Sequence, residues 1–489
     1  MLPLQTMIKI DFKSSIPVYM QLANGISSLI SDGTLAPNAK LPSSRRLAAI
    51  MELNRNTVVR SIDELQIQGW IKVIPSRGAH VNGDIPEFVP KPLISKGLSM
   101  IADQASFGYK RTGLNWYESD SAIPVKVKVD EGIPDVRIAP INEFRRTFSA
   151  VLSRNSGLKL LNYGDAQGNI DLRRTLVGYL RHTRGLKFSE QQILITRGSQ
   201  MGIYLAATLM LEKGDKVGVG QLNYTTANQT MKFVGGKLID LRHDEEGLDI
   251  SHLTTMCEKH RMKMVYVTPH HHHPTTAMMS AERRIRLLNL ARKHNFCVLE
   301  DDYDYDFHYK RSPRLPLASM DTSGHVIYIG SICKLMAPGV RVGYMIGPTD
   351  FIKEATLLRR VLDRQGEQAI EYSLSQMIKN GDLQRHSRKA IKIYHERRDR
   401  LVEILNNAKL FEFTTPEGGM AIWVKLKADY SWGVLTEALM KRGVAIPDWR
   451  TFDSKNIGHK GMRLGFASLN EQEMQYFGTQ LIEVANDLT

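Results

Sequence analysis

Cysteines and long apolar runs are both scarce in this sequence. Its 489 residues include three cysteines, Cys257, Cys297 and Cys333, which lie far apart. An odd number at this spacing suggests neither a disulfide framework nor a CxxC metal motif, and it is typical of a reducing compartment. No apolar run reaches the roughly 18 residues that cross a membrane, and the N-terminal residues lack the features of a signal peptide. These absences predict a cytoplasmic protein with no membrane partner.

Acidic residues are fewer than basic ones. The sequence has 51 Asp and Glu residues against 65 Lys and Arg, which gives a formal net charge of +14. This excess favours an anionic partner such as nucleic acid. Residues 1–83 hold nine basic and five acidic residues, so most of the surplus lies further along the chain. A basic enzyme therefore remains an alternative on charge alone.

The first 83 residues have the pattern of a small DNA-binding domain. Residues 17–31, 43–51 and about 56–68 place apolar side chains at helical spacing, and Ser43 is a suitable cap for the second helix. Two strand-like runs, 70–74 and 79–81, follow around a Pro- and Gly-containing turn. The order helix, helix, turn, helix, hairpin predicts a winged helix-turn-helix over residues 8–83.

The third helix of such a domain enters the major groove of double-stranded DNA. Arg55 and Asn56 in its first turn could pair with guanine or adenine edges, and Arg60 lies one turn further on. The remaining candidates would hold phosphates or, at the wing tip, reach the minor groove; they are Ser44, Arg45, Thr57 and Arg77. The alternative is a solvated polar face on a small helical domain.

This segment closely resembles the winged-helix head of GntR-type regulators over about 75 residues. The resemblance implies sequence-specific binding to a promoter operator. The matching residues are Pro17, Tyr19, Gln21, Leu22, Gly33, Leu35, Pro37, Leu41-Pro42-Ser43, Arg45, Leu47-Ala48, Arg55 and Thr57-Val58.

The rest of the chain predicts a linker and a larger α/β domain. Residues 84–118 contain several prolines and weak periodicity, as linkers do. From 119 to 489, strand-like runs alternate with helix-length segments, which predicts a mostly parallel sheet wrapped by helices. A small α+β subdomain is expected from about 385, with residues 418–424 as one of its strands.

Lys334 heads a set of residues suited to pyridoxal phosphate (PLP). A buried lysine amine with a lowered pKa can form a Schiff base with a carbonyl cofactor. Asp301, after an apolar run, could hold the pyridine nitrogen, and Tyr303 could hydrogen-bond the phenolic oxygen of the ring. Tyr224 could stack on the ring.

The phosphate of such a cofactor also has candidate donors. Ser199 and Gln200 open a helix directly after a strand, where free backbone N–H groups favour anions. Ser331 and Arg341 flank Lys334 and could add side-chain donors.

Each of these residues has an ordinary alternative reading. A single lysine after a strand usually lies on the surface, and Asp301-Asp302 could form a turn or a metal pair. Histidine is a zinc ligand, but the consecutive side chains of His270–His273 point in different directions and rarely converge on one ion, so no metal is predicted.

Together the cofactor residues match fold-type-I aminotransferases in kind and order, and further motifs resemble the MocR/GabR-like branch of GntR regulators. That branch joins such a head to an aminotransferase-like body. The resemblance implies a homodimer in which Tyr163 reaches the partner's phosphate, and it implies that Arg463 grips an effector carboxylate. The motifs are Tyr163-Gly164, Gly168, Leu172-Arg173, 268–276, Met279-Ser280, Arg283-Arg284, 300–304, Phe307, 331–344 and 462–467.

Four positions depart from that pattern. Cys333 replaces the usual Ser or Thr before the lysine. Arg197 stands where serine is common, and it could contact the phosphate or simply face solvent. In the histidine-rich loop, His272 and Thr276 replace the usual Gln and Gly. This loop lies where the ring oxygen and an effector would sit, so it leaves both effector identity and catalytic turnover open.

These observations predict a PLP-dependent transcriptional regulator that senses PLP or an amino-acid-like effector through an internal aldimine on Lys334. The alternative is a PLP-dependent aminotransferase with an accessory DNA-binding head. The resemblance argues for weak or absent turnover, although partial transamination chemistry remains possible.

Overall fold

The computed structural model describes residues 4–84, 104–114, 125–309, 314–452 and 458–488. The chain forms two compact units, Met1–Lys110 and Arg111–Thr489. Most of the expected linker, residues 85–103 and 115–118, lies outside the described residues.

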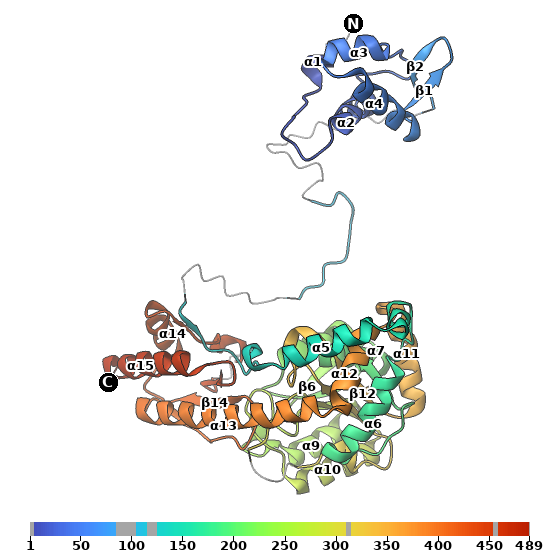
Figure 1. Cartoon of the computed structure of the whole chain (residues 1–489). Coiled ribbons are helices and arrows are strands. Elements are labelled where there is room, and N and C mark those ends of the chain that lie inside the picture. The colour runs from blue at the N-terminus through green and yellow to red at the C-terminus, as the bar shows by residue number, and fades with distance from the viewer. Residues whose placement is uncertain (1–3, 85–103, 115–124, 310–313, 453–457, 489) are drawn as a thin grey trace. The chain divides into compact units, whose positions relative to one another are not determined.

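The N-terminal unit is a winged helix-turn-helix (Figure 1). Its core is formed by apolar side chains of its second, third and fourth helices, including Leu22, Ile26, Leu47, Val58 and Leu65, each at most 1% exposed. The third expected helix begins at Arg55, one residue earlier than predicted, because the Asn54 side chain accepts from the Asn56 N–H and caps it. The elements are α1 (Leu4–Met7), α2 (Val18–Ser31), α3 (Ser44–Met51), α4 (Arg55–Ile67), β1 (Ile71–Ile74) and β2 (Gly78–Val81).

A seven-stranded sheet is the centre of the larger unit. All neighbouring strands are parallel except β12, which is antiparallel to both β11 and β4. The expected mostly parallel sheet is therefore confirmed. In spatial order the strands are β4 (Ile193–Thr196), β12 (Gly343–Ile346), β11 (Val326–Ser331), β10 (Cys297–Asp302), β9 (Met262–Val267), β5 (Lys216–Gly220) and β6 (Lys237–Leu241).

Helices cover both faces of this sheet because side chains of successive strand residues point to opposite sides. In β4, Leu194 packs with one group of helices, and Ile193 and Ile195 pack with the other. The first group is α7 (Gly198–Met210), α8 (Thr225–Phe233) and α11 (Thr349–Leu362). The opposite face carries α6 (Ile170–Arg184), α9 (Ile250–Lys259), α10 (Ala281–His294) and α12 (Gln368–Lys379). The remaining elements of this part are η1 (Val136–Ile138), α5 (Ile141–Leu152), η2 (Asn155–Leu161), β7 (His243–Asp244), β8 (Gly247–Leu248), η3 (Leu317–Ser319) and η4 (Pro338–Val340).

The C-terminal part adds a three-stranded antiparallel sheet in the order β13-β14-β16, against which the long helix α13 packs beside α15 (Figure 1). The strand expected at 418–424 begins at Ala421, because Gly419 has a left-handed φ of +79°. Its elements are α13 (Asp382–Ala408), β13 (Phe411–Phe413), β14 (Ala421–Leu426), α14 (Trp432–Lys441), η5 (Trp449–Thr451), β16 (Gly461–Gly465) and α15 (Glu471–Leu488). Strand β15 (Val444–Ala445) pairs with β3 (Val127–Lys128). This pairing places the first strand of the larger unit against the C-terminal part of the same unit.

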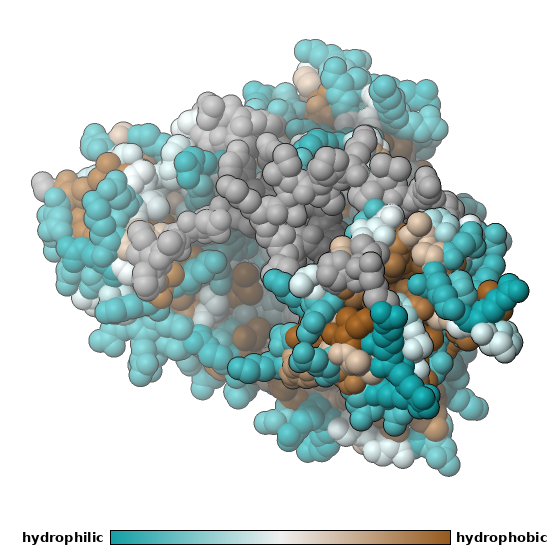
Figure 2. Space-filling view, turned by 90° about the horizontal axis from the view of Figure 1, so that it is seen from above, coloured by the Kyte–Doolittle hydropathy of each residue, from teal (hydrophilic) through white to brown (hydrophobic). Residues whose placement is uncertain are grey.

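In the view of Figure 2, hydrophilic residues cover most of the coloured surface and apolar residues form small groups. Within the described ranges, no helix is both long and apolar enough to cross a membrane.

Candidate functional site

Lys334 lies in the turn that follows β11, an inner strand of the sheet. Its neighbours Cys333 and Leu335 are buried, and Lys334 itself is partly buried. Burial lowers the pKa of the Lys334 amine, and this outweighs the attraction of Asp304. A lowered pKa increases the fraction of neutral amine, which is the form that attacks a carbonyl group.

Asp301 lies near the end of the neighbouring strand β10 and is 3% exposed. Its Oδ2 accepts a hydrogen bond of 2.7 Å from the Tyr266 hydroxyl. Its Oδ1 is buried without a hydrogen-bond partner among the described residues. Burial raises the pKa of Asp301 to about 7. An unsatisfied buried carboxyl oxygen requires a donor, and a protonated pyridine nitrogen is a donor of the right kind.

The possibility that Asp301 and Asp302 form a turn or a metal pair is wrong. Both residues belong to β10, so their side chains point to opposite faces of the sheet. Asp302 accepts a hydrogen bond from the Tyr328 hydroxyl on the opposite face.

The expected phosphate donors converge at the start of α7. Gly198 has a φ of +73°, and a Cβ atom there would lie 2.7 Å from the Arg341 Nη2 atom. Arg341 also donates to the Arg197 carbonyl at 2.8 Å, which holds its guanidinium beside the free N–H groups of Ser199 and Gln200. The site thus combines a helix N-terminus with a cation, as an anion requires.

Ser331, Cys333 and Arg197 complete the surroundings of that cradle. Ser331 is buried, and its Oγ accepts from the Cys333 N–H at 3.1 Å. The Cys333 thiol donates to the Val342 carbonyl. Arg197 pairs with Asp363 at 3.1 Å and Glu367 at 2.6 Å, so its charge is balanced by carboxylates. Of the two alternatives for Arg197, the structure agrees with exposure to solvent, because its side chain is 46% exposed while it pairs with these carboxylates.

Aromatic and imidazole rings line the space beside Lys334. The Tyr224 ring lies 5.3 Å from the His273 ring at an interplanar angle of 70°, and the Tyr303 ring lies 6.1 Å from the same histidine. The Tyr303 hydroxyl donates to the His271 carbonyl at 3.0 Å. Burial lowers the pKa of His273 well below its ordinary value, so its ring is neutral at physiological pH.

Arg463 extends from β16 into the same region and is 1% exposed. Its guanidinium donates to the Glu131 carbonyl at 2.7 Å, to the Pro274 carbonyl at 3.1 Å and to the Tyr303 hydroxyl at 3.2 Å. A guanidinium has five N–H donors. Two therefore remain for a ligand beside Tyr303, which fits a carboxylate.

In the histidine-rich loop, the side chains of His270, His271 and His272 are buried rather than exposed to solvent. His271 Nδ1 lies 2.8 Å from Asp304 Oδ1, and both side chains are at most 2% exposed. Burial lowers the pKa of His272 to about 3, and its Nδ1 lies 2.7 Å from the Thr275 hydroxyl. No group of three or more metal-ligating side chains is found in the part of the chain that the structure describes.

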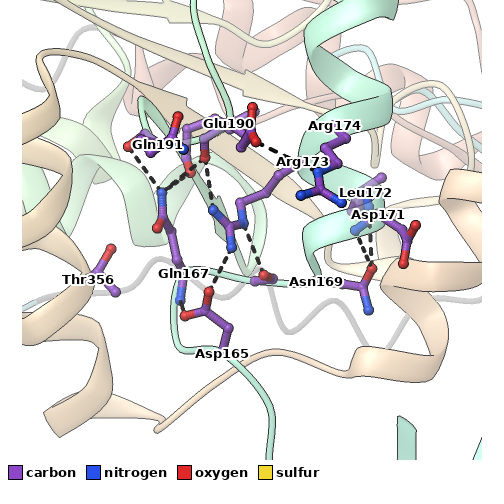
Figure 3. A network of polar contacts seen from close by, with 12 residues as sticks. Asp165, Gln167, Asn169, Asp171, Leu172, Arg173, Arg174, Glu190, Gln191 and Thr356 are labelled. Atoms are coloured by element: carbon purple, nitrogen blue, oxygen red, sulfur yellow. Dashed lines mark hydrogen bonds and ion pairs between the residues drawn. The ribbon is translucent and has the colours of Figure 1, made fainter.

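The Tyr163–Arg173 motif forms the turn that leads into α6. Tyr163 is 76% exposed, and the Arg364 guanidinium lies 3.8 Å from its ring centroid. Arg173 pairs with Asp165 at 2.6 Å and also donates to the Gly168 and Glu190 carbonyls (Figure 3). The motif arginine therefore holds the turn together, whereas Tyr163 points outward.

The candidate DNA-contacting residues lie on the N-terminal unit. Arg45, Arg55, Asn56, Arg60 and Arg77 are exposed. Ser44 and Thr57 are half-buried. The Arg60 guanidinium lies 4.4 Å from the centroid of the Tyr19 ring. Arg55 and Asn56 occupy the first turn of α4, where a recognition helix presents side chains to base edges.

Three contacts around the site were not expected from the sequence. They are the hydrogen bond from Tyr266 to Asp301, the pair of His271 with Asp304 and the hydrogen bond from Arg463 to the Glu131 carbonyl. Each of these contacts joins residues that are far apart in the sequence. Tyr266 and Asp301, for example, are 35 positions apart. The Asp304 and His271 positions fall within the noted motifs, which was the only available signal.

A body of this fold, with a partly buried lysine, an unsatisfied aspartate and an anion cradle, defines the class of fold-type-I aminotransferase-like proteins. Residues 127–481 match the family model described as aminotransferase class I and II, and residues 18–81 match that of the bacterial regulatory proteins of the gntR family. The chain belongs to the aminotransferase class I and II family and carries a head of the gntR family, and regulators named MocR and PdxR are among its relatives.

Two regulators align with this chain over nearly its whole length, and a solved aminotransferase aligns with most of it. The probable rhizopine catabolism regulatory protein MocR of Rhizobium meliloti is 23% identical, with 96% of this chain and 94% of that protein covered. The pyridoxine biosynthesis transcriptional regulator PdxR of Corynebacterium glutamicum is 25% identical, with coverage of 95% and 94%. The solved multiple substrate aminotransferase of Thermococcus profundus matches with a TM-score of 0.71 and 25% identity, covering 78% of this chain and 98% of that one.

Proposed function

We propose that this chain is a DNA-binding transcriptional regulator whose body holds PLP on Lys334 and responds to PLP or to an amino-acid-like effector. The observation that carries the cofactor assignment is the buried Asp301 Oδ1 without a partner, on the strand next to the one that leads to Lys334. When bound, PLP supplies a carbonyl for amines and an electron-withdrawing ring.

Different residues of the chain would hold different parts of that cofactor. Asp301 would bind the ring nitrogen, while Tyr224 and His273 would bound the ring. Ser199, Gln200, Ser331 and Arg341 would bind the phosphate. Tyr303 would bind the ring oxygen by turning its hydroxyl proton away from the His271 carbonyl, to which it donates in this structure.

In a homodimer, ligand binding at this site would change the affinity of the protein for DNA. We propose that exposed Tyr163 reaches the phosphate of the partner subunit, and that Arg55 and Asn56 read bases. Ser44, Arg45, Thr57, Arg60 and Arg77 would bind the DNA backbone or the minor groove. Effector and DNA must then change each other's affinity by the same factor.

Replacing Lys334 by alanine tests the proposal. The Lys334→Ala variant should lose the visible absorbance of the bound cofactor while remaining folded, since it lacks the amine that attaches PLP. Lys259→Ala, an exposed lysine of α9, is the matched control. Gel-shift titration of operator DNA with and without PLP should then differ for the wild type and not for Lys334→Ala. DNA binding that ignores PLP and every amine would refute the regulator.

The second candidate is an aminotransferase with an accessory head. It is favoured by the lowered pKa of Lys334, since a freed neutral lysine can shuttle protons. Sustained conversion of an amino acid and a keto acid by the wild type, absent in Lys334→Ala, would support this function instead.

A further inference from the structure

Two loops of the larger unit pack against each other. They are residues 162–169, between η2 and α6, and residues 363–367, between α11 and α12. The Gly164 N–H donates to the Gln365 side chain, and a Cβ atom on Gly164 would lie 2.6 Å from Gln368 Cδ. Because the loops approach so closely, their outer side chains form one surface, which we call the paired loops.

Tyr163 and Arg364 are the side chains that the paired loops present together. Both are exposed, and the Arg364 guanidinium lies 3.8 Å from the centroid of the Tyr163 ring. Arg364 forms no ion pair with a carboxylate in the described part of the chain, since Asp363 and Glu367 pair with Arg197. Its charge is therefore available to an anion that approaches the Tyr163 ring.

The backbone of Arg364 adopts an unfavourable conformation. Its φ is +65°, in the left-handed region that is more costly for a residue with a side chain than for glycine. Strained residues of this kind persist where the side chain has a function. The conformation therefore points to a role for the guanidinium beyond the folding of its own loop.

Apolar side chains are exposed beside both of the paired loops. Leu161 is 65% exposed directly before the first loop, and Val361 is 85% exposed shortly before the second. Grouped apolar residues on a surface mark a place that another molecule covers. A second copy of this chain is the occupant that fits, because the proposed homodimer brings Tyr163 to the phosphate of the partner subunit.

We propose that Arg364 binds the phosphate of the cofactor that the partner subunit holds. The guanidinium lies on the Tyr163 ring, so a phosphate that the Tyr163 hydroxyl reaches is also accessible to Arg364. Each phosphate would then contact one arginine from each subunit, Arg341 from the subunit that holds the cofactor and Arg364 from the other. This inference rests on the proposed function, because it requires PLP on Lys334 and a homodimer.

The first test compares the affinities of the cofactor-free, full-length protein for PLP and for pyridoxal, which lacks the phosphate. Binding is measured by the visible absorbance of the bound cofactor. Arg364→Gln should weaken PLP binding at least about tenfold, which is about 1.4 kcal/mol, and should leave pyridoxal binding within about twofold. Arg360→Gln, an exposed arginine of α11, is the matched control and should change neither affinity by more than about twofold.

Mixed dimers decide whether Arg364 acts in the partner subunit. A Lys334→Ala subunit and an Arg364→Gln subunit carry different affinity tags and are purified together through both tags. The subunit that retains Lys334 then meets an intact Arg364, so one site in each mixed dimer should bind PLP with wild-type affinity. Affinity as weak as that of the Arg364→Gln homodimer would place Arg364 at the site of its own subunit and overturn the inference.

Urea unfolding of the cofactor-free Arg364→Gly protein separates binding from folding. Glycine relieves the left-handed backbone, so the midpoint should stay equal or rise while PLP binding weakens as in Arg364→Gln. A lower midpoint together with equal losses of PLP and pyridoxal affinity would show a structural role and overturn the inference. Weaker PLP binding in Tyr163→Phe with none in Arg364→Gln overturns this inference and leaves the proposed function in place. Absence of the cofactor absorbance in the wild type overturns both.

Discussion

Replacing Asp301 by asparagine should make the cofactor-free protein more stable at about pH 8. Burial raises the pKa of this carboxyl from an ordinary 3.8 to about 7. Between these values the folded protein keeps a proton that the unfolded chain has lost, so the free energy of unfolding falls as the pH rises. A shift of this size corresponds to a loss of up to about 4 kcal/mol by pH 8.

Asparagine removes that loss, because it cannot ionise and its oxygen can still accept the Tyr266 hydrogen bond. Burial also raises the pKa of Glu300 to about 7 and that of Asp302 to about 6. The wild-type protein therefore has a pH dependence from all three carboxyls. The difference between the wild type and Asp301→Asn isolates the contribution of Asp301.

The assay is urea unfolding of the cofactor-free wild type and variant at about pH 5 and pH 8, with exposed Asp429→Asn as the control. The variant should gain stability relative to the wild type as the pH rises. It should also bind PLP at least tenfold more weakly, because a hydrogen bond to a charged group is worth about 1.5–3 kcal/mol. Equal losses of stability in both proteins would refute the raised pKa of Asp301. Equal PLP affinities would refute its contact with the ring nitrogen.

Three further predictions concern other parts of the chain. Thr276 has a left-handed φ of +59°, so Thr276→Gly should raise the unfolding free energy by about 0.5–1 kcal/mol in urea; a loss would show that the threonine side chain is required. His271→Ala leaves Asp304 buried and unpaired, and should lower the body's stability by about 3 kcal/mol, whereas His260→Ala should not. Arg55→Ala should weaken operator binding by about 1–3 kcal/mol and nonspecific binding less; an unchanged footprint would place base reading elsewhere.

Local sequence patterns predicted the elements of the fold well because their signals are themselves local. The helix expected at residues 43–51 is observed at Ser44–Met51, with Ser43 as its cap. The short helix α1 was not predicted, since four residues are too few to show a period. The start of β14 was placed early, because Gly418 and Gly419 form a turn that alternation alone does not reveal.

The sequence predicted which residues form the site, but it did not predict which side chains pair with one another. Lys334, Asp301 and Arg341 follow strands or helix ends that the sequence marks, so their convergence could be expected from the parallel sheet. The pairing of Arg197 with Asp363 and Glu367 could not be expected, because it joins side chains that the chain separates by more than 160 positions. The hydrogen bond between Tyr266 and Asp301 could not be expected either, because the two residues are 35 positions apart in the sequence.

The sequence by itself determined the two-part organisation, the winged helix, the α/β body and the residues suited to a PLP cofactor. These properties follow from periodicity, capping and motif order, which neighbouring residues encode. Only the tertiary structure decided that Asp301 has an unsatisfied oxygen, that His271 pairs with Asp304 and that Glu131 lies beside Arg463. Burial and charge at a site are sums over side chains brought together by folding, so no single stretch of sequence carries them.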